Sequence, residues 1–576
     1  MNAAHCERVR ICNLSGLRPS LRSIIIATAR HHVAFGPFSA VSDLWRVLQG
    51  RETQKMRMSN FATVAALSMS TIAGAGWAET ATIGISIAPS TLDPQLSLVT
   101  SDVGIYRHIY GSLVKVDSNN QVVLDLATSY RPVDEYTWEF KLREDVKFHD
   151  GSAFDANDVV FTLERLGTVP GHDGLAAQYV APITDVEVVD SHTLLLKSEQ
   201  VTPDMPKRLA QISIISNELP DDVTSAQFNS GEAAIGTGPF KYNDWQRGNQ
   251  LVLDRYEGYW DDPATFEQVI LKTMTNPATR VAALEAGDVD MVDNIPPLDA
   301  QRLMDNDDVT VALGSSGRAH FLQFDTTSEV PPLTTAKDGT PLTENPFADL
   351  RVREALSLAV SRDLIVERIM DGFAEAISQG VPEGFEGYNP ELEVPEYDID
   401  RAKTLLSEAG YPDGFALTLG CSNDRYVNDA ALCQAVGQMW SGIGMDVTVD
   451  TTPKAVYFKK LLAGEYPAHL LAWGNTSGDS ISFLKSIVGT PNKEHGRGSY
   501  NRSYSNPELD VLIDKAAATV IEAERVKLLK EAMAVAVDEQ VFLPLHVNSV
   551  IAATRQGLSY TPQKDENTNA MNLRKE

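Results

Sequence analysis

One arginine that follows a predicted strand is the strongest candidate for a ligand contact in this sequence. Residues 421–426 read Cys-Ser-Asn-Asp-Arg-Tyr and come directly after an apolar stretch that predicts a strand. A guanidinium group presents a planar fork of donors, which matches the two oxygens of a carboxylate. Arg425 is therefore expected to hold an anionic group, with Tyr426 beside it. The alternative is a surface arginine that pairs locally with Asp424.

A second polar stretch also follows a predicted strand. Trp473-Gly474-Asn475-Thr476 comes after the apolar residues 468–472, and Asp479 is the next acidic residue along the chain. A tryptophan at a strand end beside a glycine suits the wall of a cleft, and it suits a core position equally well. Trp473 to Thr476 are therefore candidates for the same ligand site, and Asp479 is a further candidate.

Two further places offer polar groups to a ligand. The loop Ala88–Thr91 follows the alternating strand at 80–87 and presents the Ser90 hydroxyl and backbone groups, so Ser90 and Thr91 are candidates. His320 opens another alternating strand and is a candidate cleft residue. A lone histidine is more often structural than a metal ligand, and we expect no metal site.

Catalytic and cofactor motifs are absent from the sequence. It contains no Gly-x-Ser-x-Gly, no His-Glu-x-x-His, no Cys-x-x-Cys and no Gly-x-x-x-x-Gly-Lys. The 78 acidic residues are so numerous that a pair of carboxylates carries no information. We expect a protein that binds its ligand without chemistry, and we expect no cofactor.

Of the four cysteines, only Cys421 and Cys433 lie beyond residue 78. Two such cysteines in an oxidising compartment often pair, but their separation of 12 residues does not by itself bring the side chains together. The sequence leaves two alternatives, a disulfide or two buried thiols.

The elements that must position these groups alternate between strand and helix. Strands are predicted at 416–419, 446–449 and 468–472, and helices are predicted at 351–371, 399–409, 430–443 and 505–538. Residues 136–142 alternate strictly and predict another strand. Asp155 and Asp158 are typical of a helix start. This alternation predicts an α/β fold.

Length and composition limit the possible functions. The chain has 576 residues, too many for one hydrophobic core, so we expect several packed units. Its 43% hydrophobic and 22% charged residues are typical of a globular protein. The 49 basic residues against 78 acidic ones give a net charge of −29, which argues against nucleic acid as a partner.

The first 78 residues differ from the rest. Lys55 and Arg57 precede an apolar run at 61–77, and Gly76-Trp77-Ala78 ends in a small residue. This layout predicts a signal peptide at 56–78 with cleavage near Ala78. Residues 1–55 are expected to be an upstream extension that is not native. The mature protein is expected to be soluble and periplasmic.

Six stretches along the mature chain together resemble a known family, the periplasmic solute-binding proteins of peptide, nickel and related ABC importers, often called solute-binding protein family 5. In chain order they are Thr91-Leu92-Asp93-Pro94, Trp138 to Arg143 with Phe148 to Gly151, Asp158 to Phe161, Gly236 to Phe240, Arg351 to Leu356, and Tyr397-Asp398 leading to Gly410. Their order and spacing agree over about residues 80–560.

The resemblance implies a type II two-lobed (venus-flytrap) α/β fold with an extra subdomain in the first lobe. We expect lobe I at 79–273, with the subdomain at about 122–212, lobe II at 274–545, and a C-terminal return to lobe I at 546–576. Crossing strands are expected near 272–275 and 544–548. The solute lies between the lobes, which close about a few hinge residues.

The resemblance also implies roles for residues in the second lobe. Similar dipeptide-binding proteins hold the ligand carboxylate with an arginine-containing loop at the position of Arg425. They place an acidic residue for the peptide amino terminus at the position of Thr476. Either Asp479 replaces it, or the ligand is not a free-amine peptide. Lys454 lies where relatives have a pocket residue, although an exposed lysine at a helix start is the alternative.

The function implied is capture of a small solute, a peptide or a peptide-like anion, and its delivery to permease subunits in the inner membrane, which ATPase subunits drive. The protein is expected to be a monomer. Alternatives are a periplasmic peptide chaperone or a sensor. Within transport, alternative ligands are a nickel or haem chelate and an oligosaccharide.

Overall fold

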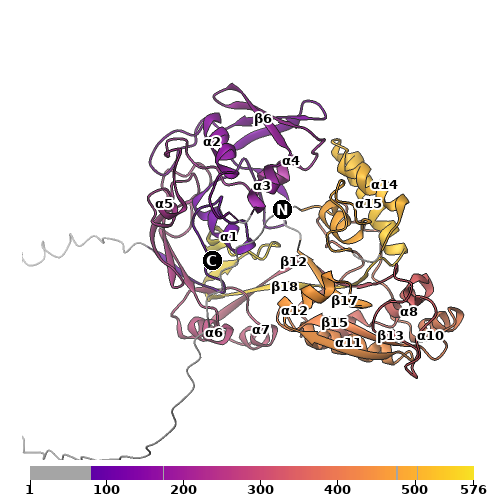
Figure 1. Ribbon diagram of the computed structural model, residues 1–576. Coiled ribbons are helices and arrows are strands. Elements are labelled where there is room, and N and C mark those ends of the chain that lie inside the picture. Colours follow the sequence, from indigo (N-terminus) through magenta and orange to yellow (C-terminus); the bar gives the residue numbers. More distant parts are fainter. Residues whose placement is uncertain (1–78, 173, 475–477, 502–503) are drawn as a thin grey trace, which may run out of the picture. The chain divides into compact units, whose positions relative to one another are not determined.

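The computed structural model describes residues 79–172, 174–474, 478–501 and 504–576 (Figure 1). These residues belong to one compact unit. The expected upstream extension and signal peptide, residues 1–78, lie outside the described residues and stay predictions. No helix in the described ranges is both long and apolar enough to cross a membrane.

A long mixed sheet runs through both lobes. Its main path in the described residues contains, in spatial order, β13 (Thr334–Thr335), β15 (Ala416–Ser422), β17 (Ala468–Gly474), β12 (Val309–Phe324), β18 (Leu543–Arg555), β11 (Met291–Val292), β1 (Thr80–Ile85), β10 (Gln268–Thr273), β9 (Gln250–Arg255) and β8 (Phe240–Gln246). Two more strands lie off this path, β14 (Ala374–Ala376) on β18 and β16 (Asp446–Thr452) on β15.

Two long strands connect the lobes. β12 and β18 pair antiparallel from Val309–Arg555 to Leu322–Leu543, with register shifts between Ser315 and Ala319 and between His320 and Phe321. One part of β18 pairs with β11, while the far half of β12 pairs with β17. Each strand therefore belongs to both lobes, as Figure 1 shows for β12 and β18.

The position of the first crossing differs from the expected one. After Thr273 the chain forms α6 (Pro277–Ala286) and then β11, which pairs with β1 of the first lobe. We therefore propose that the first lobe extends to β12 and does not end at residue 273. The second crossing, β18, includes the expected residues 544–548.

The first lobe is built from both ends of the chain. Its core contains Ala81 and Ile83 of β1 together with Ala552 of β18 and Leu573. Other elements of this lobe are α1 (Thr100–Ile109), β2 (Val114–Val116), β3 (Val122–Leu124), α5 (Ser225–Asn229), α7 (Pro297–Met304), β19 (Leu558–Tyr560) and β20 (Leu573–Lys575).

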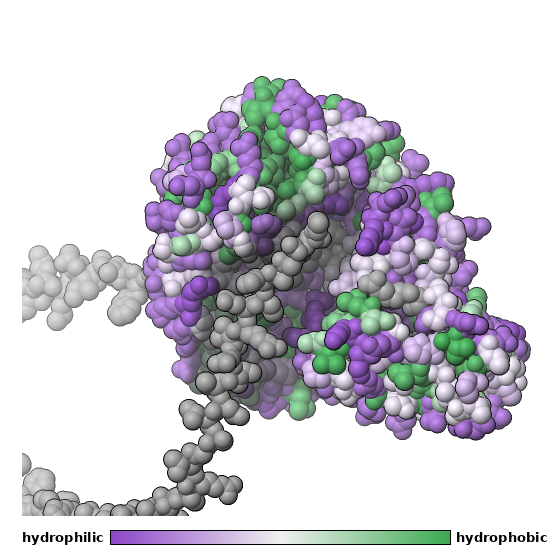
Figure 2. Space-filling view, in the orientation of Figure 1, coloured by the Kyte–Doolittle hydropathy of each residue, from purple (hydrophilic) through white to green (hydrophobic). Residues whose placement is uncertain are grey.

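A separate four-stranded antiparallel sheet forms the extra subdomain. Its strands in spatial order are β4 (Ala127–Pro132), β5 (Thr137–Leu142), β7 (Thr193–Ser198) and β6 (Ile183–Asp190), and its helices are α2 (Ala156–Leu166), α3 (Leu175–Val180) and α4 (Met205–Leu209). The predicted start of α2 is confirmed, because Asp155 and Asp158 form a capping box. Figure 2 shows apolar side chains at the surface at the top of the view, where Figure 1 places β6. Val188 and Val189 of this strand are exposed.

The second lobe alternates strand and helix as predicted. In chain order its helices are α8 (Leu350–Leu358), α9 (Arg362–Leu364), α10 (Ile399–Glu408), α11 (Asp429–Ser441), α12 (Lys454–Leu462), α13 (Ile481–Phe483), α14 (Pro507–Ala517) and α15 (Glu522–Asp538). β15 is parallel to β16 and to β17, and α11 and α12 connect the three strands. The carboxyl ends of β15 and β17 therefore lie side by side, and the candidate loops follow them.

Candidate functional site

The loop that carries Arg425 is held firmly between β15 and α11. The buried carboxylate of Asp429, the first residue of α11, accepts the Ser422 hydroxyl at 2.7 Å. The same carboxylate accepts the backbone N–H groups of Arg425 at 3.1 Å and Tyr426 at 3.2 Å. Three hydrogen bonds to one carboxylate oxygen fix the loop from which both side chains project.

A disulfide joins the two elements that flank this loop. Cys421 of β15 and Cys433 of α11 are bonded, with Cα atoms 6.6 Å apart, and both are fully buried. Of the two alternatives that the sequence left open, the structure therefore shows the disulfide. It closes a chain segment that contains Arg425, Tyr426 and Asp429.

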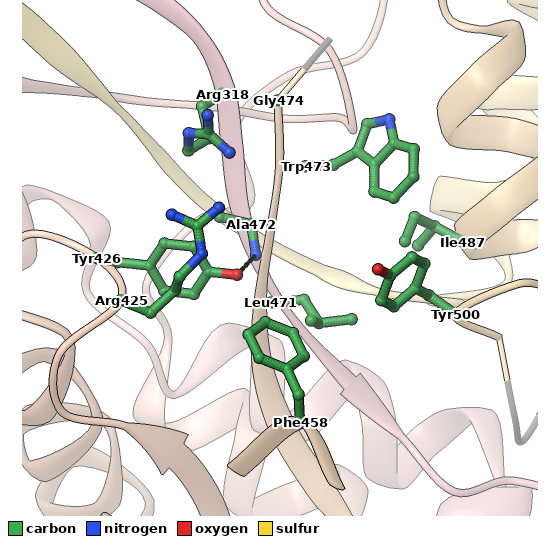
Figure 3. A pocket seen from close by; sticks show the side chains of 10 residues that line it. All are labelled: Arg318, Arg425, Tyr426, Phe458, Leu471, Ala472, Trp473, Gly474, Ile487 and Tyr500. Carbon is green, nitrogen blue, oxygen red and sulfur yellow. Dashed lines mark hydrogen bonds between the residues drawn. The ribbon is translucent and has the colours of Figure 1, made fainter. Parts of the chain in front are cut away.

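A cavity of about 190 Å³ lies beside this loop (Figure 3). Its lining comes from β12, the Arg425 loop, α12, β17 and the chain after α13. The lining residues are Arg318, Arg425, Tyr426, Phe458, Leu471, Ala472, Trp473, Gly474, Ile487 and Tyr500. Four of the residues singled out in the sequence, Arg425, Tyr426, Trp473 and Gly474, thus meet at one place.

Two guanidinium groups lie on the same side of the cavity (Figure 3). Arg318 is ion-paired with Glu566, at 3.0 Å between Nη2 and Oε2. Arg425 is exposed and has no ion pair with any described residue. The local alternative, a pair with Asp424, does not form, because the Asp424 carboxylate accepts the backbone N–H of Lys454 at 2.6 Å. The Arg425 charge is available to a ligand.

Aromatic and apolar side chains form the opposite side. Figure 3 shows Trp473, Ile487 and Tyr500 facing the two arginines across the cavity. Trp473 and Tyr500 meet edge to face with ring centres 5.6 Å apart. The Tyr426 hydroxyl accepts the backbone N–H of Ala472 at 3.2 Å, and burial raises the pKa of this phenol, so it stays neutral. Trp473 is half-buried and is a wall residue.

Several predicted site residues lie elsewhere. Asp479 is fully buried and is ion-paired with Lys207 and Arg525, so it does not replace the missing amine partner in this cavity. His320 is buried behind Tyr426, with ring centres 5.3 Å apart, and does not line the cavity. Lys454 is exposed at the first turn of α12, which agrees with the alternative given for it. Asn475 and Thr476 lie outside the described residues.

The Ala88–Thr91 loop serves the first lobe and does not reach the cavity. The Ser90 hydroxyl donates to Asp102, and the Thr91 hydroxyl donates to Asn229 at 3.0 Å. Asp93, two residues later, is fully buried and binds Arg165 through both carboxylate oxygens, at 3.0 and 2.7 Å. These internal partners use the polar groups that the sequence offered to a ligand.

Sequence reasoning missed Arg318, Phe458, Ile487 and Tyr500. Arg318 lies two residues before His320 on the same strand, and its position on a crossing strand is what brings it to the cavity. Among the described residues, no group of three histidine, cysteine or acidic side chains is arranged to hold a metal ion.

Comparison with known proteins assigns the chain to a family. The sequence profile described as "Bacterial extracellular solute-binding proteins, family 5 Middle" matches residues 121–495, more than half of the chain. Heme-binding protein A of Haemophilus influenzae is 26% identical over 489 residues, covering 80% of this chain and 85% of that protein. The dipeptide-binding protein of Escherichia coli is 25% identical over 498 residues, covering 81% and 89%.

A solved structure agrees with this assignment. The structure of HbpA2 from Haemophilus parasuis superposes with a TM-score of 0.75 at 22% identity, covering 86% of this chain and all of that one. At this identity the likeness shows the two-lobed fold alone, and the profile match shows the family. The chain belongs to the bacterial extracellular solute-binding proteins of family 5.

Proposed function

We propose that this protein captures a small anionic solute with an apolar portion and delivers it to the membrane permease of an ABC importer. Capture and delivery are the work of family 5 proteins, and the cavity supports the class of solute. The observation that carries the proposal is Arg425, which lines the cavity without an ion pair to any described residue. A carboxylate of the solute supplies the bidentate partner that this guanidinium lacks.

The apolar part of the solute packs against the opposite wall. Trp473, Tyr500 and Phe458 present aromatic surface to the cavity. Burial of apolar surface contributes about 25 cal/mol per Å², so an aromatic or aliphatic group of ordinary size adds a few kcal/mol. The arginines then orient the solute, and the aromatic wall adds affinity.

The solute proposed here lacks the free amino terminus of a simple peptide. None of the described residues that line the cavity is acidic. Asp479, the nearest acidic candidate in sequence, is occupied by Lys207 and Arg525. A buried ammonium group without an anionic partner costs several kcal/mol. The relatives include a heme-binding and a dipeptide-binding protein, so family membership alone does not choose the solute.

The proposed location is the periplasm, after export and cleavage near Ala78. The basic, apolar and small-residue succession at 55–78 supports export. The family description, extracellular solute-binding proteins, agrees with it. N-terminal sequencing of the protein from its native host tests the proposal, and a start at Glu79 is the expected result.

Native mass spectrometry of the protein as purified, without refolding, tests the class of solute. The expected result is a bound species whose released mass and charge identify an organic acid without a free α-amino group. A bound di- or tripeptide with a free amino terminus, or tight calorimetric binding of such peptides, contradicts the proposal. Copurification with permease subunits in detergent distinguishes import from the chaperone and sensor alternatives.

A further inference from the structure

Four charged side chains meet where the extra subdomain touches the second lobe. The Lys207 ammonium of α4 lies 2.7 Å from Glu386 Oε2 and 3.1 Å from Asp479 Oδ2. The Arg525 guanidinium of α15 binds the same two carboxylates, at 2.7 Å from Glu386 and 2.6 Å from Asp479. Each carboxylate thus contacts one cation from each side of the boundary between the lobes.

The packing of the neighbouring residues assigns each member of the cluster to a lobe. Met205 and Leu209, which flank Lys207 in α4, belong to the core under the four-stranded sheet. Phe385, Ile481 and Leu529 follow or precede the other three members by one to four residues in sequence. These three apolar residues belong to one core in the second lobe. Lobe opening about β12 and β18 would therefore remove Lys207 and leave the other three together.

The charges of the cluster do not balance without Lys207. Glu386, Asp479 and Arg525 carry two negative charges and one positive charge, so their formal sum is −1. Asp479 is fully buried, and the side chains of Arg525 and Lys207 are only 5% and 11% exposed. A net charge in such surroundings is costly unless a counter-ion is present. Lys207 supplies that counter-ion only when the lobes are in contact.

Other close contacts between the lobes surround the cluster. The Gln121 side chain donates to the backbone carbonyl of Gly384, and Lys564 Nζ donates to that of Glu383 at 2.8 Å. A Cβ atom added to Gly478 would lie 2.1 Å from the Asn120 carbonyl oxygen, so the chains approach closely. These contacts show how closely the two lobes approach each other beside the cluster.

We propose that Lys207 stabilises the closed arrangement of the lobes by neutralising this cluster, so that the protein populates the closed arrangement before a solute binds. Opening moves Lys207 into water and exposes the excess carboxylate, which water then solvates. Loss of the Lys207 charge therefore penalises the closed arrangement and spares the open one. The inference depends on the two-lobed fold and is independent of the solute proposed above.

A partly closed starting population has a direct consequence for binding. The apparent affinity of a two-lobed protein scales with the fraction of molecules in the competent arrangement. Lys207 is thus a positioning residue for solute capture, although it lies outside the cavity at Arg425 and does not line it.

Hydrogen exchange on solute-free full-length protein tests the proposal. Solute is removed by dialysis in guanidinium chloride and refolding, and native mass measurement checks its removal. The variants are Lys207→Met and, as a matched control on the same helix, Arg208→Met. Arg208 pairs with Asp204 of its own lobe, at 2.9 Å. The amides at 118–121 and 383–387 report on the contact between the lobes, and those of β15 report on folding.

In the wild type, we expect protection at 118–121 and 383–387. In Lys207→Met, exchange at these amides accelerates about tenfold or more, because couplings of this kind are typically 5- to 150-fold. β15 and the Arg208→Met control stay unchanged. The charge-swapped double variant Lys207→Glu with Glu386→Lys recovers part of the protection. An unprotected wild-type boundary, unaltered exchange in Lys207→Met, or an equal effect in Arg208→Met would overturn the proposal.

Discussion

At the residue scale, Arg425 differs from Arg353 and Arg362 of the same lobe, because its guanidinium has no acceptor among the described residues. Arg362 donates to the Pro544 carbonyl at 2.7 Å, and Arg353 donates to the Phe347 carbonyl at 2.7 Å. Both are buried and serve the fold. Arg425 is exposed, its backbone is held through Asp429, and its guanidinium lies over the Tyr426 ring, 5.2 Å from the ring centre. Its guanidinium is therefore the one in this comparison with free binding capacity.

Replacement of Arg425 by alanine is predicted to weaken binding of the identified solute by on the order of 2–5 kcal/mol, because a buried solute carboxylate would lose its charged partner. Calorimetric titration measures the change. Lys454→Ala is the matched control, since Lys454 is a nearby exposed cation outside the cavity lining, and its affinity should remain within about threefold of the wild type. Equal affinities for Arg425→Ala and wild type would remove Arg425 from the site.

Replacement of Arg165 by methionine is predicted to lower the free energy of unfolding by about 3–5 kcal/mol, because it leaves the fully buried Asp93 without its ion pair. Urea unfolding at pH 7 measures this loss. The control is Lys197→Met, which breaks an exposed pair with Glu187 and should cost about 1 kcal/mol or less. Similar losses in the two variants would show that the buried Asp93–Arg165 pair contributes no more to stability than an exposed pair does.

This pair also marks what the sequence does not reveal at the residue scale. Thr91-Leu92-Asp93-Pro94 is recognisable as a motif, but its partner Arg165 is 72 residues away. The sequence therefore offers Ser90 and Thr91 as ligand candidates, whereas the structure gives their hydroxyls internal acceptors. Asp479 is one of two sequence alternatives for the amine partner for the same reason, since no residue near it in sequence indicates its ion pairs with Lys207 and Arg525. Arg425 was found because its position after a strand is a local signal.

At the element scale, β15, α11 and the loop between them together position Arg425. The disulfide joins the carboxyl end of β15 to the second turn of α11, and Asp429 fixes the backbone between them. The two devices act on the same short segment, so the segment is organised before a solute arrives. A loop that is already ordered loses less conformational entropy when the solute binds.

Reduction of the Cys421–Cys433 disulfide is predicted to lower the free energy of unfolding by about 3 kcal/mol, the value expected for a closed loop of this size. It should also weaken solute binding, because the Arg425 loop gains freedom. Urea unfolding with and without dithiothreitol, followed by calorimetry, measures both effects. The double variant Cys421→Ala with Cys433→Ala should not respond to dithiothreitol. A wild type that is equally unresponsive, although mass measurement shows it to be reduced, would contradict the prediction.

Helix boundaries were harder to predict than helix existence. The range 399–409 matches α10, and 430–443 matches α11. The range 505–538 is two helices, because the β-branched residues Thr519, Val520 and Ile521 disfavour helix and the Thr519 hydroxyl binds the Lys515 carbonyl at 2.7 Å. The range 351–371 is broken after α8, where Ser361 caps the short α9. Apolar periodicity is local, whereas these interruptions depend on single polar groups.

At the scale of the whole molecule, buried histidines couple stability to pH. Burial lowers the pKa of His108, His149, His469 and His546 to about 4 in each case, and it also lowers the pKa of His320 well below its ordinary value. His320 and His546 stack on the two crossing strands, with ring centres 4.5 Å apart. The unfolded chain holds these protons more tightly than the folded one, since an exposed histidine has a pKa near 6.5.

The free energy of unfolding is therefore predicted to fall as the pH drops below about 6.5, and to keep falling until the folded form is protonated near pH 4. Each such histidine contributes a loss of about 2 kcal/mol between pH 8 and pH 5. Urea unfolding at several pH values measures the slope. His469→Gln removes one of these groups, so the variant should lose about 2 kcal/mol less unfolding free energy between pH 8 and pH 5 than the wild type does. An identical slope in wild type and variant would contradict the assignment.

The participation of both chain ends in one core has a consequence for the order of events during synthesis. Ala81 and Ile83 pack with Ala552 and Leu573, so the first lobe cannot complete its core until almost the whole chain has left the ribosome. Contacts between residues this distant in sequence also form slowly, because the entropy cost of closing the long loop comes before the contacts stabilise the chain. The part of the first lobe built on β1 therefore completes its core only late in synthesis, whereas the buried core of the extra subdomain comes from residues 113–214 alone.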